Sequence, residues 1–258
     1  MSNLMNKIDF VALIAVDRAN ANGDPLNGNR PRTDYNGFGE MSDVCIKRKI
    51  RNRMQDLGHS IFVQSEDRCD DGFGSLSERA TAEMKGEKNR EVYAQKACAK
   101  WLDVRTFGQV FAFKDAKGVS VGVRGPVSIH QAISVSPIEV ESLQITKSVN
   151  GEKGEKGGNR TSDTMGMKHF VRFGLYLLKG SINVQLAEKT GFAYEDAQVV
   201  KLYWFEHDAK SGQYSTAKVH RSVKVVQKNP MDIPTSVDDY EITLEKLPGL
   251  NPEIIDGL

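Results

Sequence analysis

The amino-acid sequence predicts an α+β fold in which the strands form an antiparallel sheet. The candidate elements follow one another as strand, helix, strands, helix and strands, an order typical of this class. No linker divides the 258 residues, and a chain of this length can bury a substantial core. Its contents of hydrophobic (39%) and charged (27%) residues are ordinary for a globular protein. We therefore expect one domain over residues 1–258, with insertions at residues 17–41, 65–90 and 148–168.

The N-terminal segment, residues 8–16, is almost continuously apolar. This pattern predicts a strand that is covered on both faces and lies in the centre of its sheet. The polar stretch that follows, residues 17–41, has too many Asn, Gly and Pro residues to hold a regular element. Loops of this length in compact domains are usually functional or disordered. This loop carries Arg18, Arg30 and Arg32.

A basic helix is predicted over residues 42–57. Ser42 is a favourable N-cap, and Asp43 suits the positive end of the helix dipole. One apolar stripe at helical spacing faces the core, formed by Ile46, Ile50, Met54 and Leu57. Lys47 and Arg51 flank this stripe, and Arg48 lies opposite it.

The five cations and two acids of this helix give it a local charge of +3. A charge run of this kind is most often a solvated helix face. The alternative is a face that neutralises phosphates. We expect the second, because acids one turn away from the cations, which would neutralise them, are lacking.

The remaining elements follow from apolar periodicity and breaker residues. Helices are expected at residues 75–87, 89–104 and 194–206, and strands at residues 60–64, 119–123, 138–147, 170–178, 182–186, 219–226 and 240–244. Gly108 is a natural C-cap, next to which Arg105 either satisfies the last helix carbonyls or reaches a phosphate. Gly125 permits close approach of a backbone and follows Arg124 at a strand end. Gly180 indicates a bulge or bend.

Residues 148–168 form a glycine-rich, mildly basic arm between two strands. Such arms are most often simple mobile loops. The segment from Met165 to His169 is less ordinary, because exposed methionines can wedge against bases.

Charge is unevenly distributed along the chain. From Met231 onward, seven acids and one lysine give −6, so the preceding residues carry +7. This asymmetry fits a nucleic-acid footprint on one face, or an acidic end that docks on the basic face of a neighbouring copy. The three cysteines have no metal-site spacing and predict free thiols in a reducing, cytoplasmic environment. No apolar run approaches the ~20 residues needed to span a bilayer, and we expect no membrane association.

Motifs for common catalytic chemistry are absent from the sequence. There is no phosphate-binding G-x-x-x-x-G-K-[ST], no H-E-x-x-H and no G-x-S-x-G. The aromatic signature of ordinary RNA-recognition modules is also missing, which leaves backbone contacts as the expected mode of RNA binding. Three loop carboxylates, Asp17, Asp24 and Asp34, are candidate catalytic groups. Isolated aspartates in Asn/Gly loops are far more often turn formers.

Three segments carry a resemblance to a known family. They are an apolar strand followed by DRANANGDPLNGNRPRTD and the basic helix; DVRTFG (residues 103–108) with VRGPVS (residues 123–128); and MGMKHFVRFGLY (residues 165–176). Together they span most of the chain, which resembles the CRISPR Cascade backbone subunits of the Cas-seven family in its type I-C branch. Met167 stands where this family has a basic residue.

The resemblance implies a modified RRM-like (ferredoxin-like) antiparallel palm with an inserted thumb. In the family the thumb folds over the guide RNA of an adjacent copy and displaces one nucleotide. The implied partners are CRISPR RNA, target DNA through the guide, further copies of the chain arranged head to tail, and other Cascade subunits. No cofactor, metal or catalytic residue is expected. The expected RNA contacts are Arg18, Arg32, Ser42, Lys47, Arg48, Arg51, Arg105, Arg124, Met165, Met167, Lys168 and His169.

Two other functions stay open on the sequence. Related RNA-targeting subunits cleave RNA with a loop aspartate, so a metal-dependent RNase using Asp17 or Asp24 is one alternative. The other is a stand-alone module that binds single-stranded RNA without assembling.

Overall fold

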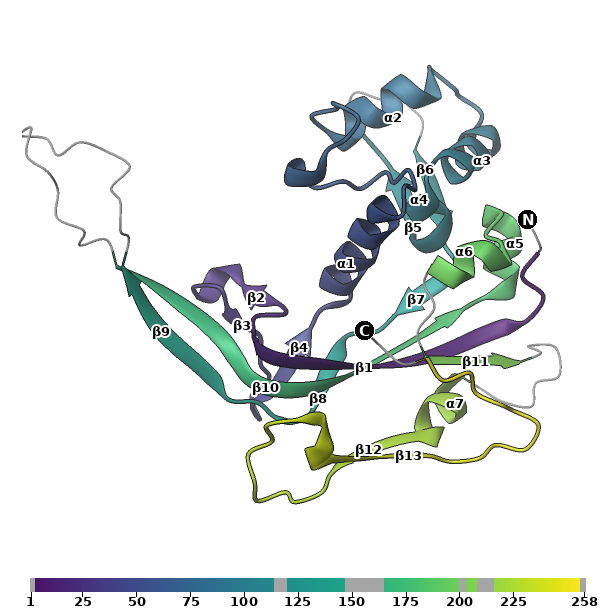
Figure 1. Ribbon diagram of the computed structural model, residues 1–258. Coiled ribbons are helices and arrows are strands. Elements are labelled where there is room, and N and C mark those ends of the chain that lie inside the picture. Colours follow the sequence, from purple (N-terminus) through teal and green to yellow (C-terminus); the bar gives the residue numbers. More distant parts are fainter. Residues whose placement is uncertain (1–2, 114–119, 147–164, 200–202, 208–215, 256–258) are drawn as a thin grey trace, which may run out of the picture.

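A seven-stranded antiparallel sheet forms the centre of the molecule (Figure 1). The computed structural model describes residues 3–113, 120–146, 165–199, 203–207 and 216–255. The strand order is β11 (Tyr203–His207), β1 (Lys7–Ala19), β10 (Met165–Ile182), β8 (Ala132–Pro137) and β4 (Phe38–Met41), while β7 (Val127–Ile129) and β9 (Val140–Thr146) also pair with β10. The predicted α+β class is confirmed, and β1 lies between β10 and β11 as a central strand.

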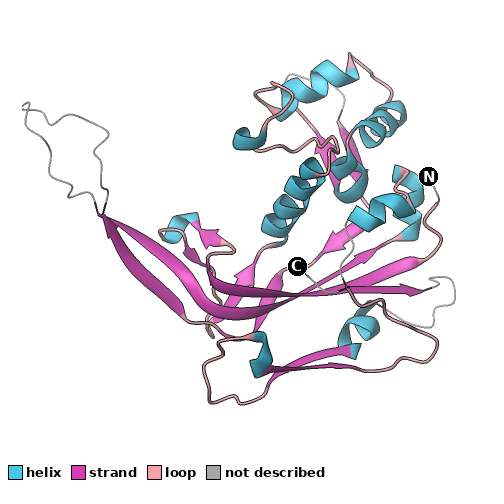
Figure 2. Cartoon of the chain, viewed as in Figure 1, coloured by secondary structure: helices cyan, strands magenta, loops and turns pink. Residues whose placement is uncertain are grey.

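The sheet is covered on both faces, which explains why β1 is almost continuously apolar (Figure 2). Alternate side chains of a strand point to opposite faces. Ile8 and Phe10 join the core beneath the helices α1 (Asp43–Asp56), α5 (Val184–Thr190) and α6 (Tyr194–Val199). Val11 packs on the other face, beside α7 (Thr216–Ser222), β12 (Val223–Gln227) and β13 (Tyr240–Leu244).

A second, aromatic core lies in the helical region between β4 and β7. It contains α2 (Leu76–Met84), α3 (Arg90–Lys100), α4 (Leu102–Phe107), β5 (Gly108–Phe111) and β6 (Val121–Arg124). Phe62 is its centre, with ring centroids 4.7 Å from Trp101 and 5.0 Å from Phe111. This core reaches from Phe62 to Val121 and so extends beyond the insertion predicted at residues 65–90.

The predicted helix over residues 89–104 is two helices. Trp101 separates them with extended backbone angles (φ −114°, ψ 120°), and its ring is buried against Phe62. The break turns α4 away from α3. Gly108 caps α4 as predicted.

Two strand predictions were wrong. Residues 60–64 form no strand, although Ile61 and Phe62 are fully buried. The Asp103 carboxylate, rather than a neighbouring strand, accepts hydrogen bonds from the backbone N–H groups of Phe62 and Val63. Residues 182–186 are not a strand either: β10 ends at Ile182, and Asn183 caps α5 by accepting from the Leu186 N–H. Gly180 marks no bulge, since the register of β10 with β1 runs through it unbroken.

The helix predicted at residues 194–206 ends at Val199, and its last part is β11. The strand predicted at residues 219–226 begins as α7 and becomes strand only at Val223. Strands outside the predicted set include β4, β5, β7 and β8, each of six residues or fewer. Segments this short give only a weak periodic signal.

Candidate nucleic-acid interface

A two-stranded arm, exposed over much of its length, is formed by β9 and the first seven residues of β10 (residues 140–146 and 165–171). The strands pair in register from Met165 opposite Thr146 to Val171 opposite Val140. Figure 1 shows the arm projecting away from the rest of the sheet. Strand pairing therefore continues through residues 165–168, which were predicted as the end of a loop; the rest of that loop lies outside the described residues.

The predicted contacts at the end of the arm divide between its two faces. Residues opposite each other in an antiparallel pair share a face, and successive residues alternate. Met165, Met167 and His169 therefore lie on one face, and Lys168 lies on the other beside Leu143. Leu143, Ile145 and both methionines are exposed, and apolar side chains exposed together on both faces of a ribbon indicate a surface that is covered by a partner.

A small hairpin supports the base of the arm. It consists of β2 (Gly23–Asp24), the 3-10 turn Pro25–Asn27 and β3 (Arg30–Pro31). Arg30 donates to the Ser142 hydroxyl (3.2 Å), which is 2.8 Å from Nδ1 of His169. The hairpin thus places a guanidinium and an imidazole together at the point where the arm leaves the sheet. Sequence reasoning placed His169 in the site but missed its link to Arg30 and Ser142, residues far apart in the chain.

The polar loop predicted at residues 17–41 is therefore organised by regular elements, and the prediction that it holds none was wrong. Asp24 accepts from the Leu26 N–H (3.2 Å) and pairs with Arg32 (3.4 Å). Asp34 accepts from two backbone N–H groups, those of Asn36 and Phe38. Both carboxylates act as turn formers.

The hairpin is tied directly to the N-terminus of α1. Asn22 Oδ1 accepts from both the backbone N–H (2.8 Å) and the hydroxyl (3.1 Å) of Ser42. Ser42 in turn caps the helix by accepting from the Cys45 N–H, as predicted. Ser42 is thus engaged in fixing the loop to the helix, and its position connects the arm base to the basic helix.

Arg18 lies in the part of β1 that runs beside the arm base. Its neighbours Asp17 and Ala19 pair with Phe173 and Val171 of β10. Arg18 has φ of 45°, which is rare for a residue with a side chain, and it is exposed. The left-handed backbone interrupts the strand alternation at this cation.

The cations of α1 are more engaged than the sequence suggested. Lys47 pairs with Asp43, one turn earlier, at 3.0 Å. Arg48 donates to the Val63 carbonyl at 2.7 Å, and burial lowers the pKa of its guanidinium. The prediction that acids at helical spacing are lacking was wrong for Lys47. This helix face is covered by residues 61–70 rather than left open.

Arg51 and Arg105 each hold a buried carboxylate. The Arg51 Nε lies 2.9 Å from Oδ2 of Asp103, and its guanidinium stacks over the Phe107 ring, 5.1 Å from the centroid. Arg105 binds Asp196 through two nitrogens, at 2.8 and 2.9 Å. Arg105 also donates to the Cys98 carbonyl, so it satisfies a helix carbonyl, the first of the two predicted roles. Arg124, in contrast, is exposed at the end of β6.

Residues 6–201 match the family model described as CRISPR-associated protein Cas7. This match covers the arm, the hairpin and the basic helix. The chain belongs to this family. A curated relative, CRISPR-associated protein Cas7 of Haloferax volcanii, is 26% identical over 219 residues. That alignment covers 75% of this chain and 62% of the relative, so the chain spans less than two thirds of the relative's length.

Two solved structures similar to this Cas7 chain come from CRISPR RNA-guided surveillance complexes. A chain of the complex described as pre-nicking shares 16% identity with a TM-score of 0.46, over 75% of this chain and 69% of that one. A chain of a second complex shares 20% identity with a TM-score of 0.42, over 75% of this chain and 56% of that one.

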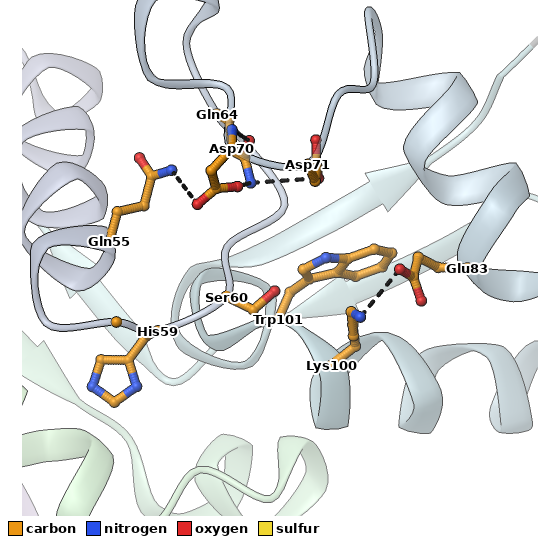
Figure 3. A pocket seen from close by; sticks show the side chains of 10 residues that line it. Gln55, His59, Ser60, Gln64, Asp70, Asp71, Glu83, Lys100 and Trp101 are labelled. Atoms are coloured by element: carbon orange, nitrogen blue, oxygen red, sulfur yellow. Dashed lines mark hydrogen bonds and ion pairs between the residues drawn. The ribbon is translucent and has the colours of Figure 1, made fainter.

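A polar cavity of about 250 Å³ lies between α1 and the helical region of the Cas7 chain (Figure 3). Its carboxylates already have partners: Asp70 accepts from Gln55 and Gln64, and Glu83 pairs with Lys100. Within the described ranges, no three His, Cys, Asp or Glu side chains are arranged to hold a metal ion. The cavity is therefore built of side chains that join two parts of the fold.

Asp71 at the edge of this cavity predicts an acid-sensitive contribution to stability. A hydrogen bond from the buried Arg79 lowers its pKa from 3.8 to about 2. A carboxyl with a depressed pKa stabilises the fold above its unfolded pKa, and this contribution disappears as the pH falls through the folded pKa. We expect the free energy of unfolding to fall between about pH 4 and pH 2, with a smaller slope in Asp71→Asn. Equal slopes in chemical denaturation at several pH values would contradict the assignment.

Two further expectations concern the whole chain. The three cysteines are free, as predicted. In the described part of the chain, no helix is both long and apolar enough to cross a membrane.

Proposed function

We propose that this Cas7 chain is a non-catalytic, repeating RNA-binding subunit of a type I-C Cascade complex in the cytoplasm. Several copies assemble head to tail along a CRISPR RNA and present its bases for pairing with target DNA, together with other Cascade subunits. The observation that carries the proposal is the arm, whose exposed methionines, Met165 and Met167, project from a base that holds Arg30 and His169. Exposed methionines with a guanidinium nearby suit contact with bases and phosphates at once.

Strand order supports a modified RRM-like palm. In a ferredoxin-like β-α-β-β-α-β unit the chain forms a strand, a helix, two strands, a helix and a last strand. This chain follows the same order with β1, α1, the pair β7 and β8 followed by β10, the pair α5 and α6, and finally β11. Within the sheet, the neighbouring strands are β11, β1, β10 and β8, in that order. The arm is then the inserted thumb, since β9 and β10 lead into and out of residues 147–164.

The proposed RNA-contact residues differ in how exposed they are and in whether they already have a partner within the chain. Arg18, Arg124, Met165, Met167 and Lys168 are exposed, while Arg32 and His169 are partly exposed in the supporting hairpin region. Phosphate contacts at Lys47, Arg48, Arg51 and Arg105 would compete with the internal partners of these side chains. Ser42 contributes by fixing the loop. Asp24 and Asp34 serve turn geometry, which supports a non-catalytic subunit.

Mass photometry on a long single-stranded RNA that carries a CRISPR repeat tests the assembly. We expect several copies per RNA that bind cooperatively. One copy per RNA would favour the stand-alone module, and absence of binding would refute the proposal. The same assemblies, incubated with complementary RNA and a divalent metal, are expected to leave that RNA intact; cleavage lost in Asp17→Ala or Asp24→Ala would establish the RNase alternative.

The arm contacts are tested by the salt dependence of binding. For single strands, each lost phosphate contact lowers the slope of log affinity against log salt by about 0.7. We expect Arg30→Ala with Lys168→Ala to lower the slope by about 1.4 on this basis. Lys224→Ala, which removes one positive charge from β12 on the other face of the sheet, is the control and should leave the slope unchanged. Equal slopes in all variants would remove the arm from the RNA contact surface.

A further inference from the structure

An apolar groove lies beside α1 on the helical face of the sheet. Its volume is about 580 Å³, within the range of about 300–1,000 Å³ typical of pockets that hold a ligand. Apolar side chains of β1 and α1 form much of its floor, among them Ala12, Ile14, Ile46 and Ile50. Ala12, Ile14 and Ile50 are only partly buried, so the groove leaves part of the core uncovered.

Two cations, Lys49 and Arg53, stand on the rim of this groove. They lie one turn apart on the flank of α1 away from Lys47 and Arg51. No carboxylate of the described residues lies within 4.0 Å of either one, whereas Lys47 and Arg51 both have acidic partners. The groove therefore combines an apolar floor with a positive rim that has no acidic partner among the described residues, a combination that favours an apolar segment with negative charge.

A segment with this chemistry exists on the opposite face of the sheet. The acidic loop (residues 228–239) connects β12 to β13 and carries one lysine and three aspartates. Met231 is 90% exposed and Ile233 is 60% exposed, with Asp232 between them. Large apolar side chains this exposed on neighbouring residues indicate a contact surface.

The acidic loop is held in one shape by hydrogen bonds. Gln227 donates to the carbonyls of Asn229 and Asp232, both at 2.7 Å. The Asn229 side chain accepts from the Met231 N–H, and Asp239 accepts from the Thr235 N–H at 2.7 Å. A loop that is already ordered loses little conformational entropy on docking. Met231 therefore lies in a loop whose backbone is held by hydrogen bonds.

We propose that the groove beside α1 receives the acidic loop of a second copy of this chain, with Met231 on the apolar floor and Asp232 and Asp238 facing Lys49 and Arg53. This interface rests on the proposed function, because it forms between successive copies on one RNA. Figure 1 shows α1 and the β12–β13 pair on opposite faces of the sheet. A contact between two different faces is heterologous, and it continues from copy to copy as a filament when the rotation between copies does not close a ring.

Charge reversal and rescue test the pairing. We expect two double variants each to weaken cooperative binding between copies about tenfold or more. One is Lys49→Glu with Arg53→Glu, and the other is Asp232→Lys with Asp238→Lys. All four changes in one chain restore opposite charges across the interface and should recover cooperativity. Mass photometry on long RNA measures it. Cooperativity that is unchanged in both double variants, or not recovered in the quadruple variant, overturns the proposal.

The apolar anchor has its own matched pair of variants. Met231→Asp is expected to lower cooperativity about tenfold or more, because the groove floor cannot solvate a carboxylate. Val226→Asp makes the same change at another exposed apolar residue, in β12 and outside the acidic loop, and should leave cooperativity intact. Binding of Met231→Asp to an RNA that holds only one copy should equal that of the wild type. Equal losses in both variants would overturn the specific role of Met231.

A cross-linking experiment without RNA separates this interface from the proposed function. In a Cys45→Ser, Cys69→Ser background, a Met231→Cys chain is mixed with a differently tagged Lys49→Cys chain and treated with a short bis-maleimide. We expect a heterodimer, and much less of one when Val226→Cys replaces Met231→Cys. If wild-type chains fail to assemble on RNA, the proposed function fails while a cross-linked heterodimer still supports the docking. Equal yields in both mixtures overturn the docking.

Discussion

Replacing Asp103 by alanine is expected to destabilise the fold by about 3–5 kcal/mol, the cost of leaving one partner of a buried ion pair alone. Asp103 is fully buried and accepts from the backbone N–H groups of Phe62 (2.6 Å) and Val63 (3.1 Å) as well as from Arg51. Its removal leaves a largely buried guanidinium and two backbone donors without this acceptor. Urea denaturation of the purified chain measures the loss.

A control change at another acid that pairs with α1 separates this effect from simple loss of charge. Asp43→Ala removes the partly exposed pair with Lys47 at the start of the helix, which is expected to cost less than about 1 kcal/mol. A loss of similar size in both variants, or an Asp103→Ala chain as stable as the wild type, would show that Asp103 does not join α1 to the segment that follows it.

The second large effect is expected at Gly125, where a side chain has no room. A Cβ atom there would lie 2.5 Å from the Gly108 backbone nitrogen, and closer still to backbone atoms of Thr106 and Phe107. Backbone cannot rotate away as a flexible side chain can, so Gly125→Ala has to shift α4 against β6. We expect a loss of about 3 kcal/mol in the free energy of unfolding, at the upper end of overpacking effects.

The strand just before Gly125 offers the matched control. At Gly122, in β6, a Cβ atom would meet no atom within 4 Å. Gly122→Ala should therefore stay within about 0.5 kcal/mol of the wild type, as surface substitutions usually do. Thermal or urea unfolding that ranks Gly122→Ala at or below Gly125→Ala would refute the close approach of these backbones.

The sequence predicted the features that depend on local patterns. The central strand, the basic helix with its Ser42 cap, the Gly108 cap and the close approach at Gly125 all follow from residue type and spacing. The strand, the helix and the two caps are decided by neighbours within a turn or two of the chain, where backbone preference and apolar periodicity act directly. At Gly125 the residue type permits a close approach, and the tertiary fold supplies the backbone of residues 106–108.

The partners of the arginines could not be predicted in this way. Arg51 and Asp103 are 52 residues apart, and Arg105 and Asp196 are 91 apart. Only the tertiary fold brings them together, so a sequence shows cations with no visible partner and suggests an open surface. The same limit hid the contact of Arg30 with Ser142. Strands of three to six residues were missed because pairing, rather than local propensity, decides them.

The length of β10 gives the molecule a mechanical property. This one strand of 18 residues starts at the tip of the described arm and ends beneath α5, so it spans about 60 Å at 3.3 Å per residue. Among the described strands, residues 165–170 pair with β9 alone, while the inner part of β10 lies between β1 on one side and β7 or β8 on the other. A sideways force on the end of the described arm is therefore expected to bend the ribbon of residues 140–146 and 165–170 before it disturbs the rest of the sheet. A pull along the strand instead loads all its hydrogen bonds to β1 together, in shear.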